Sequence, residues 1–292
     1  MQDGVKRMSG KICLVTGATS GIGAATALSL AKEGATVIGT GRDPQRCAAS
    51  AGKIIRATGN PSVDFFLADL SVQGDIHALA KQFKARYPRL DVLINNAGAR
   101  FSSRLLSADG HEMTFALNHL GYFLLTALLL DKLRHTGHAR IVNVASGAHH
   151  SCPGIDFEDL KCERSYSGKA AYAQSKLANL LFTYELDRRL KETGITVNAA
   201  GPGNVLTRFS RNNGWVSWAG HIIGSLRSGS LVGPAEGAKT TLYLALSPEV
   251  DAVSGGYFAK EKPAQSSKAS LDTDAAGRLW QISAELTKLR AA

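Results

Sequence analysis

Apolar residues in this chain fall into short runs, and longer amphipathic segments separate the runs. The runs are rich in residues that favour strands, and the segments between them repeat apolar positions with the period of a helix. This alternation predicts an α/β fold, with a single-domain, doubly wound (Rossmann-type) parallel sheet of about seven strands flanked by helices and joined by right-handed crossovers. We expect strands at 12–15, 36–40, 63–67, 92–95, 140–144, 196–199 and 256–258, and helices notably at 21–33, 72–87, 113–134 and 170–192.

No linker divides the 292 residues, so we expect one domain that spans 1–292. A chain of this length can bury most of its apolar side chains in one α/β core. Near the C-terminus, the polar stretch 260–270 is expected to be a loose connection to a last amphipathic helix at 274–289. That helix is placed either to cover a substrate entrance or to contact a second subunit.

The first apolar run leads directly into a glycine-rich turn, Thr-Gly-Ala-Thr-Ser-Gly-Ile-Gly at 16–23, and then into a helix. Glycines let the backbone turn sharply and approach a ligand, while the amides at a helix N-terminus attract a pyrophosphate. The spacing G-x-x-x-G-x-G differs from the G-x-G-x-x-G of two-domain dehydrogenases. A turn without a ligand is the alternative, but the flanking strand and helix favour a phosphate site. Its candidate cofactor contacts are Gly17, Thr19, Ser20, Gly21 and Ile22.

Tyr172 and Lys176 lie four residues apart on a predicted helix, so both side chains share one face. An ammonium beside a phenol favours the phenolate, which makes the pair a candidate proton donor and acceptor near neutral pH. The same spacing also occurs on ordinary solvated helices. The motifs upstream of the pair favour the catalytic interpretation.

Charge and cysteine content exclude several classes of protein. The formal net charge is +10, from 34 basic and 24 acidic residues, but the basic residues are scattered along helices. This distribution favours a solvated surface that attracts anionic cofactors over a nucleic-acid interface. The four cysteines lie far apart without metal-ligand spacing, so we expect reduced thiols, no disulfide framework and no metal site. They are Cys13, Cys47, Cys152 and Cys162.

Membrane segments are not expected either. The longest apolar run beside a helix, 122–130, is shorter than the roughly 20 residues that a membrane span needs. It is therefore predicted to be a buried helix. The first ten residues contain Lys6 and Arg7 but no hydrophobic stretch, so we expect no membrane anchor and a cytoplasmic location.

Further motifs follow the glycine turn in order along the chain. Asn95-Asn96-Ala97-Gly98 follows one predicted strand, Asn118 and Ser146 come next, and Pro202-Gly203 follows the sixth strand. With these motifs and the Tyr172/Lys176 pair, the chain resembles the short-chain dehydrogenase/reductase family over nearly its whole length. Several stretches resemble the retinol dehydrogenase-like branch of that family: 117–121, 143–146, 172–179, 253–258 and 278–280.

The resemblance implies a catalytic tetrad of Asn118, Ser146, Tyr172 and Lys176. Tyr172 would be the general acid, or the base in the oxidative direction, and Ser146 would orient the substrate carbonyl. Lys176 would bind the nicotinamide ribose and lower the pKa of Tyr172, and Asn118 would hold a water that links Lys176 to solvent. Alternatively, Ser146 caps a strand end and Asn118 satisfies helix backbone groups.

The residue after the second strand indicates the cofactor. Glycine stands where an acid would bind the ribose of NAD, and Arg42 follows, which favours the 2′-phosphate of NADP(H). Arg42 could instead pair with Asp43 or cap the next helix, and Asp69 could be a helix N-cap. The resemblance implies further cofactor contacts at Asp69, Leu70, Asn96, Ala97, Gly98, Tyr172, Lys176, Pro202, Gly203, Val205 and Thr207.

Two segments are candidates for the substrate pocket: 147–167 and a lid at about 204–233. In the second, large apolar residues are interrupted by glycines, which indicates either a mobile lid over an apolar cavity or ordinary packing of a short helix. We expect a bulky hydrophobic ketone, aldehyde or secondary alcohol as substrate, with reduction favoured. His149 and His150 are expected to be structural or solvent-facing, because Tyr172 fills the acid/base role.

Two other functions are compatible with the sequence. One is a non-catalytic module that senses NADP(H), which the presence of the whole tetrad disfavours. The other is reduction of an enone carbon–carbon double bond, in which Tyr172 would protonate carbon. A homodimer through the helices at 113–134 and 170–192 is also possible, although their apolar residues could equally face the sheet.

Overall fold

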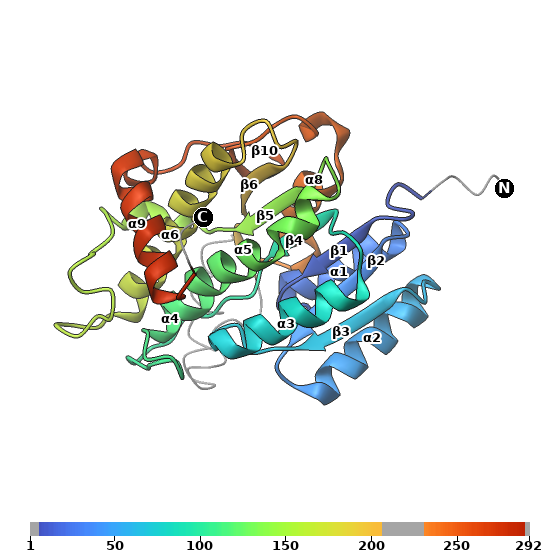
Figure 1. The fold of residues 1–292 in the computed structure, drawn as a ribbon, viewed down its shortest axis with the longest axis horizontal. Coiled ribbons are helices and arrows are strands. Elements are labelled where there is room, and N and C mark those ends of the chain that lie inside the picture. The colour runs from blue at the N-terminus through green and yellow to red at the C-terminus, as the bar shows by residue number, and fades with distance from the viewer. Residues whose placement is uncertain (1–5, 206–230, 290–292) are drawn as a thin grey trace.

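The chain folds around one sheet whose strand order is β10-β9-β6-β5-β4-β1-β2-β3 (Figure 1). The computed structural model describes residues 6–205 and 231–289. Seven of the sheet's eight strands run parallel to one another, and β10 pairs antiparallel with β9 at one edge. The strands are β1 (Ile12–Val15), β2 (Thr36–Gly41), β3 (Val63–Leu67), β4 (Val92–Asn95), β5 (Arg140–Val144), β6 (Thr196–Gly201), β9 (Tyr257–Ala259) and β10 (Lys262–Pro263).

The predicted α/β class and parallel sheet are confirmed, with one strand more than expected. The additional strand, β10, is two residues long, too short to show a hydrophobic period. A separate two-stranded pair joins β7 (Asn204–Val205) to β8 (Leu231–Val232).

Helices cover both faces of the sheet (Figure 1). One face carries α1 (Gly21–Lys32), α2 (Pro44–Thr58) and α8 (Pro234–Leu246), and the other carries α3 (Gln73–Arg86), α5 (Gly121–Arg134) and α6 (Gly168–Arg189). The buried side chains of β1 alternate between the two cores: Leu14 packs with the α3/α5 side and Val15 with the α1 side. Strand alternation thus places an apolar layer on each face of the sheet.

The predicted helix at 113–134 is interrupted. It consists of α4 (Met113–Phe115), a π-helical turn η1 (Ala116–Leu120) and then α5. By length and composition the whole stretch could cross a membrane, but 78% of its apolar window is buried inside the protein. It is therefore a core helix of this fold, in agreement with the interpretation of its apolar run.

The expectation of a loose connection at 260–270 is wrong. This stretch forms β10 and the 3₁₀ turn η5 (Lys268–Leu271). Hydrogen bonds fix two of its serines. The Tyr184 hydroxyl donates to Ser266 Oγ at 2.9 Å, and Ser270 Oγ donates to the same oxygen at 2.8 Å. The polar composition that indicated a loop instead supplies buried hydrogen bonds.

The last helix, α9 (Thr273–Leu286), packs against α6. Trp280 lies edge-on to Phe123 of α5, with ring centroids 5.0 Å apart, and stacks on Phe182 of α6 at 6.0 Å. The Arg189 guanidinium lies 4.3 Å from the centre of the Trp280 ring. These contacts attach α9 to the helix that carries Tyr172.

A buried carboxylate joins the beginnings of β1 and β4. Asp91 is 3% exposed, and its Oδ2 accepts hydrogen bonds from the Ile12 amide at 2.9 Å and Arg89 Nε at 3.1 Å. Lys11 Nζ lies 3.1 Å from the other carboxylate oxygen. This carboxylate therefore satisfies a strand-end amide that the sheet does not pair.

We predict that Asp91→Ala lowers the free energy of unfolding by about 2 kcal/mol, because the Ile12 amide stays buried without its acceptor. Asp91→Asn retains an acceptor oxygen and should lose less. Urea unfolding followed by circular dichroism measures both variants. An Asp91→Ala protein that unfolds at the wild-type urea concentration would contradict this role.

Candidate active site

The candidate site is a cleft of about 720 Å³ at the carboxyl ends of the central strands. The strand order reverses between β1 and β4, and ligands of open α/β sheets bind at such a switch point. The cleft brings together most of the predicted cofactor residues. They are Gly17, Thr19, Ser20, Gly21, Ile22, Arg42, Leu70, Asn96, Ala97, Gly98, Tyr172, Lys176 and Pro202.

Two positions of the turn between β1 and α1 accommodate only glycine without a steric clash. Gly17 has φ of +66°, and a Cβ there would lie 3.0 Å from the Ala97 Cα. A Cβ on Gly23 would come within 2.4 Å of Asn96 Nδ2 and 2.5 Å of the Gly17 carbonyl oxygen. The turn therefore packs directly on the segment after β4.

Hydrogen bonds join this turn to the Asn-Ala-Gly segment. Thr16 Oγ1 accepts from the amides of Asn96 at 2.8 Å and Ala97 at 2.9 Å, and Asn96 Nδ2 donates to the Thr16 carbonyl at 2.7 Å. At the start of α1, the N-cap Ser20 makes no side-chain capping bond. The first amides of α1 thus lack a side-chain cap and face a cleft that suits an anionic ligand.

The end of the cleft beside β2 contains an ion pair. Arg42 Nη1 lies 3.3 Å from Asp69 Oδ2, so Arg42 pairs with Asp69, whereas Asp43 caps α2 by accepting from the Arg46 amide. Asp69 is not the predicted N-cap, because α3 begins at Gln73 after Val72. Burial would raise the pKa of Asp69, but hydrogen bonds from Ser71 and the charge of Arg42 outweigh burial and lower it.

Arg46 also lines the cleft, and sequence reasoning missed it. It lies on the first turn of α2, four residues after Arg42, which places both guanidinium groups at the same end of the cleft. The signal that could have identified Arg46 is its spacing of four residues from Arg42, with the helix N-cap Asp43 between them. Thr40 and Gly41 at the end of β2 also line the cleft; Gly41 is the glycine that indicated the cofactor in the sequence, whereas Thr40 was not singled out.

Tyr172 lies on the first turns of α6, which begins where Ser167 Oγ accepts from the Ala170 amide. Burial raises the pKa of Tyr172 to about 12, although a hydrogen bond with Ser146 and the charge of Arg100 lower it in part. At neutral pH the phenol therefore holds its proton. Arg100, which follows the Asn-Ala-Gly segment, was not singled out in the sequence because its influence on Tyr172 arises only in the folded chain.

Lys176 lies one turn further along α6 and is 3% exposed. Its Nζ donates to the Val144 carbonyl at 2.8 Å and lies 5.8 Å from the centre of the Tyr172 ring. Burial lowers the pKa of Lys176 to about 7, because desolvation disfavours the ammonium. The predicted lowering of the Tyr172 pKa by Lys176 stays a prediction.

Ser146 begins the 3₁₀ turn η2 (Gly147–Ser151) directly after β5. Its Oγ accepts from the Ala148 amide at 3.2 Å, as the capping alternative required. The same hydroxyl is hydrogen-bonded to the Tyr172 phenol, so capping and proximity to the candidate acid coexist.

Asn118 lies in the π-helical turn η1 and is fully buried. Its Oδ1 accepts from the Ala99 amide at 2.9 Å, and its Nδ2 donates to the Ala99 carbonyl at 2.9 Å and to Ser175 Oγ at 3.0 Å. The side chain thus bonds to the segment after β4 and to α6, and not to its own helix. π turns of this kind are common at functional sites.

The region after β6, where the sequence predicts contacts with the nicotinamide, is only partly described. Pro202 lines it, whereas Gly203 and Val205, although described, do not line the cleft. The side chain of Val205 packs toward Gly237 of α8, where an added Cβ would lie 2.5 Å from Val205 Cγ2. Thr207 and most of the predicted lid, 206–230, lie outside the described residues.

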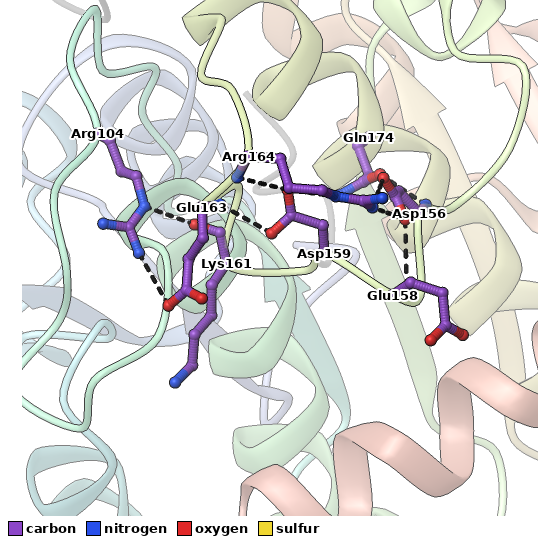
Figure 2. A network of polar contacts seen from close by, with 8 residues as sticks. All are labelled: Arg104, Asp156, Glu158, Asp159, Lys161, Glu163, Arg164 and Gln174. Carbon is purple, nitrogen blue, oxygen red and sulfur yellow. Dashed lines mark hydrogen bonds and ion pairs between the residues drawn. The ribbon is translucent and has the colours of Figure 1, made fainter.

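A network of ion pairs and hydrogen bonds holds the segment between η2 and α6. Arg104 Nε donates to the Lys161 carbonyl at 2.7 Å, and the Asp156 amide donates to Gln174 Oε1 on α6 at 2.9 Å. This half of the predicted substrate region is therefore attached to the helix of Tyr172 and to the loop after β4. Figure 2 shows the network, which contains Arg104, Asp156, Glu158, Asp159, Lys161, Glu163, Arg164 and Gln174.

Fold and cleft together define a Rossmann-type α/β protein with a ligand site at its topological switch point. A model of the short chain dehydrogenase family matches residues 11–215. The chain belongs to this family, whose members are oxidoreductases.

Several relatives share most of their length with the chain. Human retinol dehydrogenase 11 is 41% identical over 97% of this chain and 87% of its own length, and human retinol dehydrogenase 13 is 42% identical over 97% and 86%. Among solved structures, an uncharacterized protein of Mycobacterium paratuberculosis is 35% identical, with a TM-score of 0.76 over 96% of this chain and 94% of that chain. The NADP complex of Pseudomonas aeruginosa RhlG is 28% identical, with a TM-score of 0.70 over 88% and 97%.

Proposed function

We propose that the protein is an NADP(H)-dependent oxidoreductase that reduces the carbonyl group of a bulky hydrophobic ketone or aldehyde. The observation that carries the proposal is the convergence of Tyr172 and Lys176 with the glycine turn in one cleft. A proton donor and a phosphate-binding turn that face the same space are what hydride reduction of a carbonyl requires.

The residues of the cleft fit a nicotinamide dinucleotide. The glycine turn would bind the pyrophosphate, Arg42 and Arg46 the 2′-phosphate, and Lys176 the nicotinamide ribose. Gly98 lines the cleft without a side chain, and an added Cβ there would lie 3.1 Å from Asn118 Oδ1 and 3.7 Å from Lys176 Nζ, so a larger residue would crowd both groups. When bound, NADPH supplies a hydride to the carbonyl carbon of the substrate.

The chain's own residues supply the proton. As negative charge develops on the carbonyl oxygen, the Ser146 hydroxyl donates a hydrogen bond to it and the Tyr172 phenol transfers its proton. Because the pKa of Tyr172 is about 12, the phenol is protonated and ready to act as an acid at neutral pH. The pKa of Lys176 is lowered to about 7, so part of the population carries the ammonium at neutral pH, and that ammonium stabilises the phenolate that remains.

The hydrophobic class of substrate is supported by the relatives, whose names specify the oxidation of retinol, an apolar polyene alcohol. Retinal and other long or polycyclic carbonyl compounds are therefore the first substrates to test. The homodimer and the cytoplasmic location stay predictions of the sequence.

The test is NADPH oxidation, followed by absorbance, against retinal and a panel of aromatic, polycyclic and long-chain ketones and aldehydes. We expect turnover that Tyr172→Phe lowers by about 100-fold or more, since general acid catalysis contributes on this scale. An enone panel analysed by product identification separates carbonyl reduction from double-bond reduction. Tight NADPH binding without turnover of any compound would contradict the proposed enzymatic function and favour the alternative of a non-catalytic module that senses NADP(H).

The choice of cofactor gives a second prediction. Arg46→Ala should raise the KM for NADPH by about 10-fold, because a charged hydrogen bond to the 2′-phosphate is lost, and should leave the KM for NADH unchanged. Arg56→Ala, an exposed position on α2 outside the cleft, is the matched control. Equal effects of Arg46→Ala on both cofactors would show that Arg46 does not read the 2′-phosphate.

The pH dependence gives a third prediction. Alcohol oxidation needs the Tyr172 phenolate, so its rate rises with pH through the pKa of Tyr172. The Arg100 charge lowers that pKa, so Arg100→Met should raise it and move the rise in rate to higher pH. Lys169→Met, which removes an exposed charge three residues before Tyr172, should not move the profile, because water screens that charge. An unchanged profile in Arg100→Met would exclude the electrostatic contribution of Arg100.

A further inference from the structure

A buried histidine lies directly behind the candidate catalytic serine. The His149 side chain is fully buried, and its Nδ1 lies 2.5 Å from the Ser146 carbonyl oxygen. The His149 amide donates to the same oxygen at 3.2 Å. Ser146 is therefore held by two donors from one residue.

The hydrogen bond fixes the protonation of the imidazole. A carbonyl oxygen can only accept, so Nδ1 carries the proton and Nε2 is the unprotonated nitrogen. Burial lowers the pKa of His149, and although the bond to Ser146 opposes this effect, the neutral form prevails. The one ring proton is thus committed to Ser146.

Packing alone does not account for a histidine at this position. Nε2 is buried and has no hydrogen-bond partner among residues 6–205 and 231–289, and the ring lies edge-on to Tyr257 at 5.1 Å and against His150 at 4.0 Å. A buried acceptor without a partner costs about 1–3 kcal/mol, whereas a phenylalanine would fill similar space without that cost. The favourable contribution of the imidazole is its Nδ1–H bond.

The consequence for Ser146 is that both of its oxygens are oriented. Its carbonyl accepts from His149 and its Oγ accepts from the Ala148 amide, so the hydroxyl hydrogen is left for the bond with the Tyr172 phenol and, in the proposed reaction, for the substrate carbonyl. We propose that His149 is a positioning residue that directs the Ser146 hydroxyl toward the substrate carbonyl. The expected effect on kcat rests on the proposed function, whereas the protonation state and hydrogen bond of His149 do not depend on it.

The structural part is tested by nitrogen-15 NMR of the histidine rings, with the His149 signals assigned from the His149→Phe variant. We expect His149 to be the neutral Nδ1–H tautomer from about pH 5.5 to about pH 8, a range that brackets the ordinary histidine pKa of about 6.5. A neutral Nε2–H tautomer, or titration near the ordinary value, overturns the proposal whether or not the protein turns over any substrate.

The kinetic part compares two variants that separate the donor from the ring. His149→Phe keeps the ring and removes the donor, and we expect kcat for carbonyl reduction to fall by about 10- to 100-fold with little change in KM. His149→Asn places an amide donor near the position of Nδ1 and should restore most of kcat. His150→Phe, the exposed neighbour, is the matched control and should retain wild-type kcat.

A double-mutant cycle shows whether His149 acts through Ser146. In a Ser146→Ala background, His149→Phe should cause almost no additional loss of kcat, because the hydroxyl that it orients is absent. Equal losses in both backgrounds, or a His149→Asn variant as impaired as His149→Phe, would refute the positioning role. A wild-type protein without turnover would reject the proposed function, and the NMR result would still decide the tautomer.

Discussion

The geometry of the cleft depends on one hydrogen bond, from a buried ammonium to a strand-end carbonyl. Lys176 Nζ donates to the carbonyl of Val144, the last residue of β5, at 2.8 Å. Ser146 lies two residues beyond that carbonyl, and Tyr172 lies one helical turn before Lys176. This contact therefore joins the strand end that leads to Ser146 to the helix that carries Tyr172, and Asn179 Nδ2 approaches the same carbonyl at 3.5 Å.

Burial acts on Tyr172 and Lys176 in opposite directions on the pKa scale. It raises the pKa of the phenol to about 12 and lowers that of the ammonium to about 7, so in both groups it favours the neutral form. Ser146 and Arg100 oppose this effect at the phenol only. The arrangement therefore keeps a proton on the acid while providing donors and charge for the phenolate that its transfer creates.

The sequence predicted the elements and motifs whose signals are local. Apolar runs located the seven parallel strands. The glycine turn, Asn96, Tyr172 and Lys176 line the cleft, as expected from their positions at strand ends and on one face of a helix. Signals failed where a partner distant in sequence decides the structure. The π turn around Asn118 is stabilised by bonds to Ala99 and Ser175, and residues 260–270 are ordered by Tyr184, so neither shows in a periodic pattern.

Side chains around the site show the same limit. Arg42 was expected to pair with a neighbour in sequence, if with any acid, but its partner Asp69 follows the end of the neighbouring strand β3, 27 residues further along the chain. His149 and His150 were expected to be structural or solvent-facing, and adjacent positions in a 3₁₀ turn separate them into one buried and one exposed ring. Sequence patterns assigned the chemistry of such residues but not the contact through which each acts.

Four residues connect the two halves of the cleft. On one side of segment 96–99, the amides of Asn96 and Ala97 donate to Thr16 beside the glycine turn; on the other, Asn118 bonds to both backbone groups of Ala99. Asn118 also donates to Ser175, next to Lys176. The glycine turn and the helix that carries Tyr172 are therefore joined by consecutive hydrogen bonds through this one segment. Because each bond goes to a buried or half-buried group, a shift of either half would leave donors without acceptors, and the segment holds the glycine turn and α6 in fixed register.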